Sequence, residues 1–178
     1  MKIYGKVEDN YKLVPWICKR SMESNPIMIA ECTAIDKGHF KQLFMACGCL
    51  INGFLSGLRP ILFLDSSHLS GSYKGALVSA AALDANNHMF PLAYRVISLE
   101  NHEDWLCFLQ CVRALLENLD VTIVSDRHQA LNSSVSQVFS YNKHAHYFRH
   151  LKENFSSEVN KLGIGQEECK ETCIAFAS

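Results

Sequence analysis

Hydrophobic and polar positions first group into three short strands in the middle of the chain. A continuous apolar run at 61–64 predicts a strand covered on both faces. Two further apolar runs, at 76–83 and 89–97, follow after the turn-forming stretches 70–75 and 84–87. Because these connections are short, we expect the three strands to pair as an antiparallel meander.

The spacing of the apolar residues then changes from that of strands to that of a helix. Apolar side chains recur at steps of three and four from Trp105 to Leu119, with Asn101 as the predicted cap. A fourth strand is predicted at 121–124, followed by a helix over 128–139. A long helix between two strands is what a parallel crossover requires. The order predicts an α/β fold with a mixed sheet, a three-strand antiparallel meander plus a parallel strand, flanked by helices.

The flanking segments carry weaker patterns. Before the meander, we expect a helix at 14–23, a strand at 27–32 and an amphipathic helix at 40–53. After the last predicted core helix, we expect a short strand at 145–148 and a helix at 149–162.

Composition and charge narrow the class of protein. Apolar residues make up 48% of the 178 residues and charged residues 20%, which is ordinary for a globular domain and excludes a disordered or collagen-like chain. The longest apolar stretch, 44–55, is interrupted by glycine and asparagine and is too short to span a membrane. The formal net charge of −1 provides no general attraction for nucleic acid, so any DNA contact would be local.

The eight cysteines are better explained as reduced thiols than as a disulfide framework. The N-terminal residues contain no apolar segment of the kind found in a secretion signal. No CxxC motif occurs, and no cysteine and histidine spacing typical of a zinc site is present. We therefore expect a cytosolic or nuclear protein.

Two aspartates provide the candidate chemistry. Asp65 and Asp126 each directly follow or nearly follow an apolar strand, so we expect them at the same edge of the sheet, where α/β proteins bind ligands. Two neighbouring carboxylates repel each other unless a cation lies between them, and oxygen ligands suit Mg²⁺. The alternative is that each aspartate only satisfies loop amides at a strand end.

The chain also resembles the Mutator-like element (MULE) transposase domain. The stretch FLDSSHLSGSYKG at 63–75 resembles the opening of that domain, and ENHEDWLCFL at 100–109 is similar to the start of its helix. The stretch IVSDRHQAL at 123–131 resembles its second acidic signature. Residues 80–87 and 90–94 are similar to its second and third strands, in the same order.

This resemblance implies an RNase H-like fold and a DDE-type nuclease and strand transferase. Such enzymes use three acids to hold Mg²⁺ or Mn²⁺ and act on transposon terminal repeats and target DNA. Asp65 matches the first acid and Asp126 the second. The resemblance also implies a nuclear protein with DNA as its partner, and it is compatible with a homo-oligomer. It divides the chain into an N-terminal segment (1–58), a partial core (59–155) and a truncated tail (156–178).

Three departures from the family pattern predict a catalytically incomplete domain. Ser66 replaces the glycine that follows the first acid, and Tyr147 replaces a cysteine of a C-x-x-H motif that His150 otherwise keeps. No carboxylate stands where the family has its third acid. Two hypotheses follow: a partial transposase related to metal-dependent DNA cleavage, or a domesticated DNA-binding, regulatory or interaction module without catalysis.

A basic cluster lies near the C-terminal end of the predicted core. We expect phosphate contacts from Arg127, His146, Arg149, His150 and Lys152. The alternative is that these side chains form only a solvated surface.

Overall fold

The computed structural model describes residues 11–25, 27–35, 39–71, 73–139 and 141–147. The chain divides into two compact units, Met1–His144 and Ala145–Ser178. The architecture below is that of the first unit, except where residues 145–147 are named.

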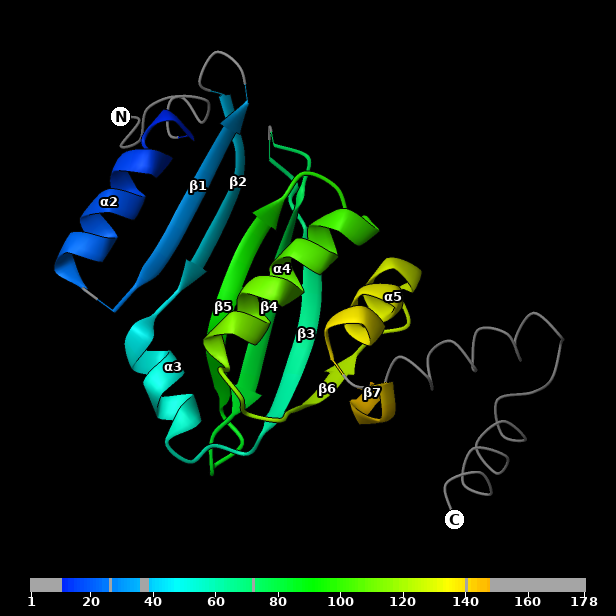
Figure 1. Cartoon of the computed structure of the whole chain (residues 1–178). Helices are drawn as coiled ribbons and strands as arrows, with labels where there is room; N and C mark the ends of the chain where they lie inside the picture. The colour runs from blue at the N-terminus through cyan, green and yellow to red at the C-terminus, as the bar shows by residue number, and fades with distance from the viewer. Residues whose placement is uncertain (1–10, 26, 36–38, 72, 140, 148–178) are drawn as a thin grey trace, which may run out of the picture. The chain divides into compact units, whose positions relative to one another are not determined.

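A mixed β-sheet forms the centre of the fold (Figure 1). Its strands are β1 (Ile29–Ile35), β2 (His39–Ala46), β3 (Ile61–His68), β4 (Ala76–Leu83), β5 (Met89–Ile97), β6 (Thr122–Ser125) and β7 (His144–His146). They lie in the order β1-β2-β5-β4-β3-β6-β7. The β3–β4 and β4–β5 pairs are antiparallel and β3–β6 is parallel, which confirms the predicted meander and parallel strand.

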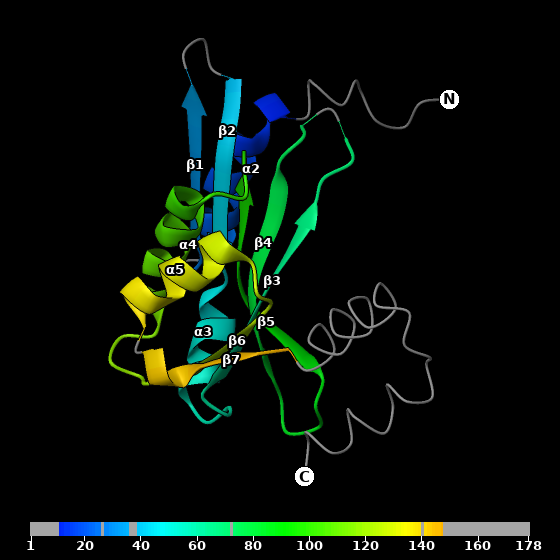
Figure 2. The ribbon, with the colours of Figure 1, turned by 90° about the vertical axis from the view of Figure 1, so that its right-hand side faces the viewer.

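Four helices in the described part of the chain flank this sheet. They are α2 (Val14–Ser24), α3 (Gly48–Leu55), α4 (His102–Leu115) and α5 (Gln129–Val138). Helices α4 and α5 lie against one face of the sheet, whereas α2 lies on the opposite face beside the β1–β2 hairpin (Figures 1 and 2). This mixed α/β architecture agrees with the expected RNase H-like fold.

The hydrophobic core lies between the sheet and helix α4. Alternate residues of β3 and β4 point into it, and Leu62, Leu64 and Val78 are completely buried there. Trp105 of α4 has an exposed fraction of 0%, so this side chain is a core residue and not a stacking platform for a base. The predicted cap is also confirmed, because the side chain of Asn101 accepts a hydrogen bond of 2.8 Å from the amide of Asp104.

The helix predicted at 40–53 is wrong. Residues 39–46 form strand β2, and only Gly48–Leu55 is helical. Phe44 is buried on the α4 side, where its ring lies 6.3 Å from that of Phe108, while Met45 points to the other face and is only half-buried. A strand with apolar residues on both faces also contains apolar pairs at steps of three and four, and this produced the false helical pattern.

The hairpin β1–β2 extends the sheet of the core. Strand β2 pairs antiparallel with β5, so part of the N-terminal segment 1–58 belongs to the same sheet as the residues that follow it. Strand β7 corresponds to the strand predicted at 145–148 but begins one residue earlier. The helix predicted at 149–162 lies outside the described residues. In the described ranges, no helix is both long and apolar enough to cross a membrane.

Candidate functional site

The parallel pair β3–β6 places the two candidate acids at equivalent positions on neighbouring strands. The paired residues are Ile61 with Thr122, Leu62 with Ile123, and Phe63 with Val124. Two residues beyond the last of these pairs stand Asp65, within β3, and Asp126, directly after β6. If the same register is continued two residues past these pairs, Asp65 stands beside Asp126 on the neighbouring strand.

The two acids share the sheet face that helices α4 and α5 leave uncovered. Their neighbours Leu64 and Ser125 are completely buried and point toward the helices. Because successive side chains of a strand alternate between faces, Asp65 points the other way and is exposed, and the same alternation carried past β6 directs Asp126 to that face. Asp126 is half-buried.

Strand β3 is longer than the apolar run that predicted it. It continues to His68 and stays paired with β4, where Asp65 lies opposite Ser79. The expectation that the strand ends at Asp65 is therefore wrong. What ends near this point is the pairing with the shorter strand β6. Asp65 therefore projects from a backbone that pairs with β4, beside the end of β6.

Both carboxylates also accept a hydrogen bond from a nearby backbone amide. The amide of Ser66 lies 2.9 Å from Oδ1 of Asp65, and the amide of His128 lies 3.1 Å from Oδ1 of Asp126. These contacts are those of the alternative interpretation, in which the aspartates satisfy local amides. A carboxylate has about four lone-pair positions, so the contact with the Ser66 amide leaves Asp65 acceptor capacity for a cation or a water molecule.

A histidine that the sequence analysis did not single out lies close to the residue before the second acid. The Oγ of Ser125 is 2.8 Å from Nε2 of His144, at the start of β7. Ser125 also donates a hydrogen bond of 2.8 Å to the carbonyl of Asp126. Nineteen positions separate Ser125 from His144, so no local spacing could have revealed this contact.

The remaining candidate residues are placed as follows. Arg127 is exposed, one residue after the second acid. His146 is the last residue of β7 and belongs to the second unit. Arg149, His150 and Lys152 lie outside the described residues. At the end of β3, His68 lies 3.7 Å from the carboxylate of Glu100.

The donor set of this site fits a hard divalent cation. Mg²⁺ commonly binds proteins through one or two carboxylates and keeps several water ligands. Asp65 and Asp126 could hold such an ion between them, with water completing its coordination. Within the described ranges, no three acidic, histidine or cysteine side chains gather into one metal-binding group. The described residues therefore offer two carboxylates, those of Asp65 and Asp126, as candidate ligands.

Two comparisons with known proteins match this chain. A family model described as the MULE transposase domain matches residues 61–154, which include both acids, all of β3–β7 and helices α4 and α5. The Arabidopsis thaliana protein FAR1-RELATED SEQUENCE 6 is 21% identical over 154 residues, or 86% of this chain. The aligned region covers only 22% of that relative's length.

Proposed function

Because the chain belongs to the MULE transposase domain family, we propose that it is a transposase-derived domain that binds a divalent cation through Asp65 and Asp126. The bound ion is Mg²⁺ or Mn²⁺, and the macromolecular partner is DNA. In this family such ions assist cleavage and strand transfer at phosphodiester bonds. We propose that Asp65 and Asp126 alone bind the ion but do not complete cleavage.

The equivalent positions of the two acids on β3 and β6 carry this proposal. Two carboxylates brought close together on one exposed face disfavour each other's charge, and a cation relieves that repulsion. The face is open on the side of Asp65, which gives a phosphate group access to the ion. Chemistry that uses two ions to stabilise both the attacking and the leaving oxygen needs a fuller ligand set. We therefore expect the two acids to bind an ion without supporting cleavage.

Thermal unfolding with and without Mn²⁺ tests the ion site. At a free ion concentration of one hundred times Kd, binding stabilises the folded chain by about 2.7 kcal/mol. For a chain of this size, Tm rises by roughly 2–4 °C per kcal/mol. We expect Asp65→Asn and Asp126→Asn each to remove this rise.

Asp84→Asn is the matched control. Asp84 accepts 2.8 Å hydrogen bonds from the amides of Asn86 and His88 in the β4–β5 turn, and so resembles the two acids without sharing their place. Its substitution should leave the Mn²⁺-dependent rise intact. A wild-type Tm that does not respond to Mn²⁺ or Mg²⁺ would contradict the ion site. Nicking of terminal-repeat DNA by the chain would contradict the proposed loss of cleavage.

A second candidate function is a domesticated nuclear module that binds DNA or protein without cutting. The departures at Ser66 and Tyr147 favour it, as does the name of the relative, which describes a FAR1-related sequence and not a transposase. Under this hypothesis, DNA binding persists in the presence of a chelator and in Asp65→Asn. If binding instead requires the ion and both acids, the first candidate is favoured.

Local basic residues would provide the DNA contact in either case. Arg127 is exposed beside Asp126, and we propose that it contacts a DNA phosphate. Phosphate contacts by His146, Arg149, His150 and Lys152 are separate proposals, because these residues belong to the second unit. A phosphate contact contributes about 0.9 to the slope of log affinity against log salt concentration. Arg127→Gln should therefore lower that slope by about one. An unchanged slope and affinity would exclude Arg127 from the DNA contact.

A further inference from the structure

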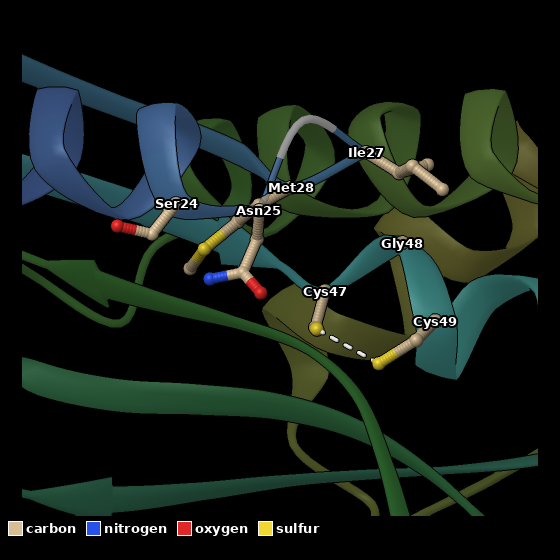
Figure 3. Close-up of a pocket in the computed structure, with 7 residues that line it drawn as sticks. All are labelled: Ser24, Asn25, Ile27, Met28, Cys47, Gly48 and Cys49. Atoms are coloured by element: carbon tan, nitrogen blue, oxygen red, sulfur yellow. Dashed lines mark hydrogen bonds between the residues drawn. The ribbon is translucent and has the colours of Figure 1, made fainter.

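Two cysteines meet at the junction between strand β2 and helix α3, far along the chain from either acid. Cys47 precedes the first residue of α3, and Cys49 lies in its first turn. Their sulfur atoms are 3.2 Å apart, and the two side chains point toward each other (Figure 3). Cys49 is exposed and Cys47 is half-buried, so both are open to a small reagent.

The two thiols differ in acidity because they share one hydrogen bond. The hydrogen bond with Cys49 holds the pKa of the Cys47 thiol below its usual value, and the backbone amides of Cys49 and Leu50 lower it further. The same contact with Cys47 raises the pKa of Cys49. Amides at the start of a helix favour a thiolate in the same way as they favour other anions. Cys47 is therefore the more acidic thiol of the pair, and so the one favoured to react first.

A small cavity and a close backbone contact fix the geometry of this pair. The cavity has a volume of about 150 Å³ and lies between the α2–β1 connection and the cysteine turn (Figure 3). Its lining residues are Ser24, Asn25, Ile27, Met28, Cys47, Gly48 and Cys49. A Cβ atom at Gly48 would lie only 2.3 Å from the carbonyl oxygen of Ile27, so the residue between the cysteines must be glycine for this packing.

We propose that Cys47 and Cys49 form a redox-responsive dithiol, in which Cys47 reacts with a hydroperoxide and Cys49 then closes an intramolecular disulfide. An accessible thiolate beside a second thiol is the arrangement found at redox-sensing cysteines. The sulfur atoms need to approach by little more than 1 Å to reach the roughly 2.05 Å of a disulfide bond. The assignment concerns a site apart from the acids and does not depend on the proposed DNA function.

The reaction balances with hydrogen peroxide as the oxidant. The Cys47 thiolate attacks one peroxide oxygen and breaks the O–O bond, which yields a sulfenic acid at Cys47 and hydroxide. The hydroxide takes up a proton and becomes water. The sulfur of Cys49 then attacks the sulfur of Cys47, releases its proton and displaces the sulfenic hydroxyl as a second water. The dithiol loses two protons and two electrons in total, and a thiol reductant such as glutathione reverses the change.

Other cysteines of the described chain provide matched controls. Cys107 and Cys111 stand one helical turn apart on α4, yet no hydrogen bond between their sulfurs accompanies this spacing in the described structure. Burial raises the pKa of Cys111. Burial also raises the pKa of Cys18 in α2 and of Cys32 in β1. A raised pKa favours the protonated thiol, which reacts more slowly with peroxide than the thiolate. These three thiols should therefore resist oxidation at neutral pH.

Peptide mass spectrometry of the full chain after a hydrogen peroxide titration tests the proposal. We expect the peptide that contains both cysteines to lose two hydrogens at the lowest peroxide concentration that oxidises any cysteine, and to regain them with reductant. Cys49→Ser should stop the reaction at a sulfenic acid on Cys47, which dimedone labels. Cys47→Ser should abolish labelling at Cys49, and Cys107→Ser should leave the disulfide unchanged.

Three outcomes would overturn the assignment. They are a first disulfide that joins other cysteines, a dimedone adduct at Cys49 instead of Cys47, and oxidation of Cys47 and Cys49 no earlier than Cys107. Thermal unfolding of the two serine variants provides a folding check. Gly48→Ala gives a second test that retains both thiols, because displacing the turn from Ile27 should slow disulfide closure. Closure at an unchanged rate in that variant would exclude the proposed role of the fixed turn.

Discussion

The two faces of the central sheet differ in burial and in chemistry. Leu64 and Asp65 are consecutive in β3, yet Leu64 has an exposed fraction of 0% beneath the helices and Asp65 is exposed on the other face. Ser125 and Asp126 repeat this contrast at β6. The helix-covered face supplies stability through packing, and the opposite face presents the candidate chemistry. Stability and chemistry can therefore be separated by substitutions at adjacent residues.

The helix-covered face also contains one buried polar network. Arg95 of β5 donates a hydrogen bond of 2.8 Å to Oε1 of Gln42, and Nε2 of Gln42 donates one of 2.5 Å to the carboxylate of Asp104. Gln42 and Arg95 each have an exposed fraction of 8%. The amide of Gln42 thus links a buried cation to an anion at the start of α4. These hydrogen bonds offset part of the cost of burying polar groups, although Nε of Arg95 and Nε1 of Trp105 have no hydrogen-bond partner among the described residues.

The largest effect should come from the core side of the comparison. Leu64→Ala removes buried methyl groups and leaves a cavity, so we expect a loss of about 2–5 kcal/mol in the free energy of unfolding. Asp65→Asn, measured without divalent cations, should change it by less than about 0.5 kcal/mol. Urea denaturation of both variants measures the difference. Equal losses would mean that the two faces do not divide stability and chemistry in this way.

The polar network should give the next largest effect. Gln42→Ala leaves both Arg95 and Asp104 without this partner, which we expect to cost about 1–3 kcal/mol. Gln42→Glu retains the acceptor for Arg95 but places a carboxylate against Asp104, so it should also destabilise the chain. Urea denaturation again provides the measurement. Wild-type stability in both variants would show that the network contributes nothing to the covered face.

The cap of helix α4 should have a smaller effect on the same face. Asn101→Ala removes the acceptor of the Asp104 amide and should cost about 1 kcal/mol. Asn101→Asp retains an oxygen at that position and should preserve most of the stability. A midpoint of thermal unfolding that is lower for alanine but not for aspartate would confirm the role of the cap. Equal midpoints for all three chains would contradict it.

The smallest effect should be seen at high pH. Burial raises the pKa of Tyr73 to about 12, and the negative charge of Asp104 adds to this. The folded chain holds the phenol proton more tightly than the unfolded chain does. This contribution to stability is complete below pH 10 and is lost as the pH rises through about 12.

Tyr73→Phe isolates this contribution from the other groups that titrate at high pH. The variant retains the ring, which packs 5.3 Å from that of Phe40, but loses the hydroxyl that donates to the carbonyl of Lys41. Unfolding measured at pH 9 and again at pH 11 should show a smaller loss in the variant than in wild type. An identical loss in both chains would exclude Tyr73 as a contributor.

The region around the acids was more predictable than the N-terminal hairpin. The runs at β3 and β6, the meander and the Asn101 cap all follow local patterns that the final structure preserves. Strand β2 was mistaken for a helix because it has apolar residues on both faces. Phe44 and Met45 are consecutive in the strand and therefore point to opposite faces of the sheet. Only assembly of the sheet between α2 and α4 reveals that both faces need apolar residues.

The amino-acid sequence determined the order of the core elements, the family resemblance and the identity of the two acids, because short-range periodicity and motifs are written into consecutive residues. Tertiary structure decided which residues face each other. The β3–β6 register sets Asp65 opposite Asp126, and chain folding brings His144 to Ser125. It also turns Cys47 toward Cys49. The first two contacts depend on how distant strands pair, and the third depends on the direction of the backbone between β2 and α3. The pattern of apolar and polar residues reveals neither.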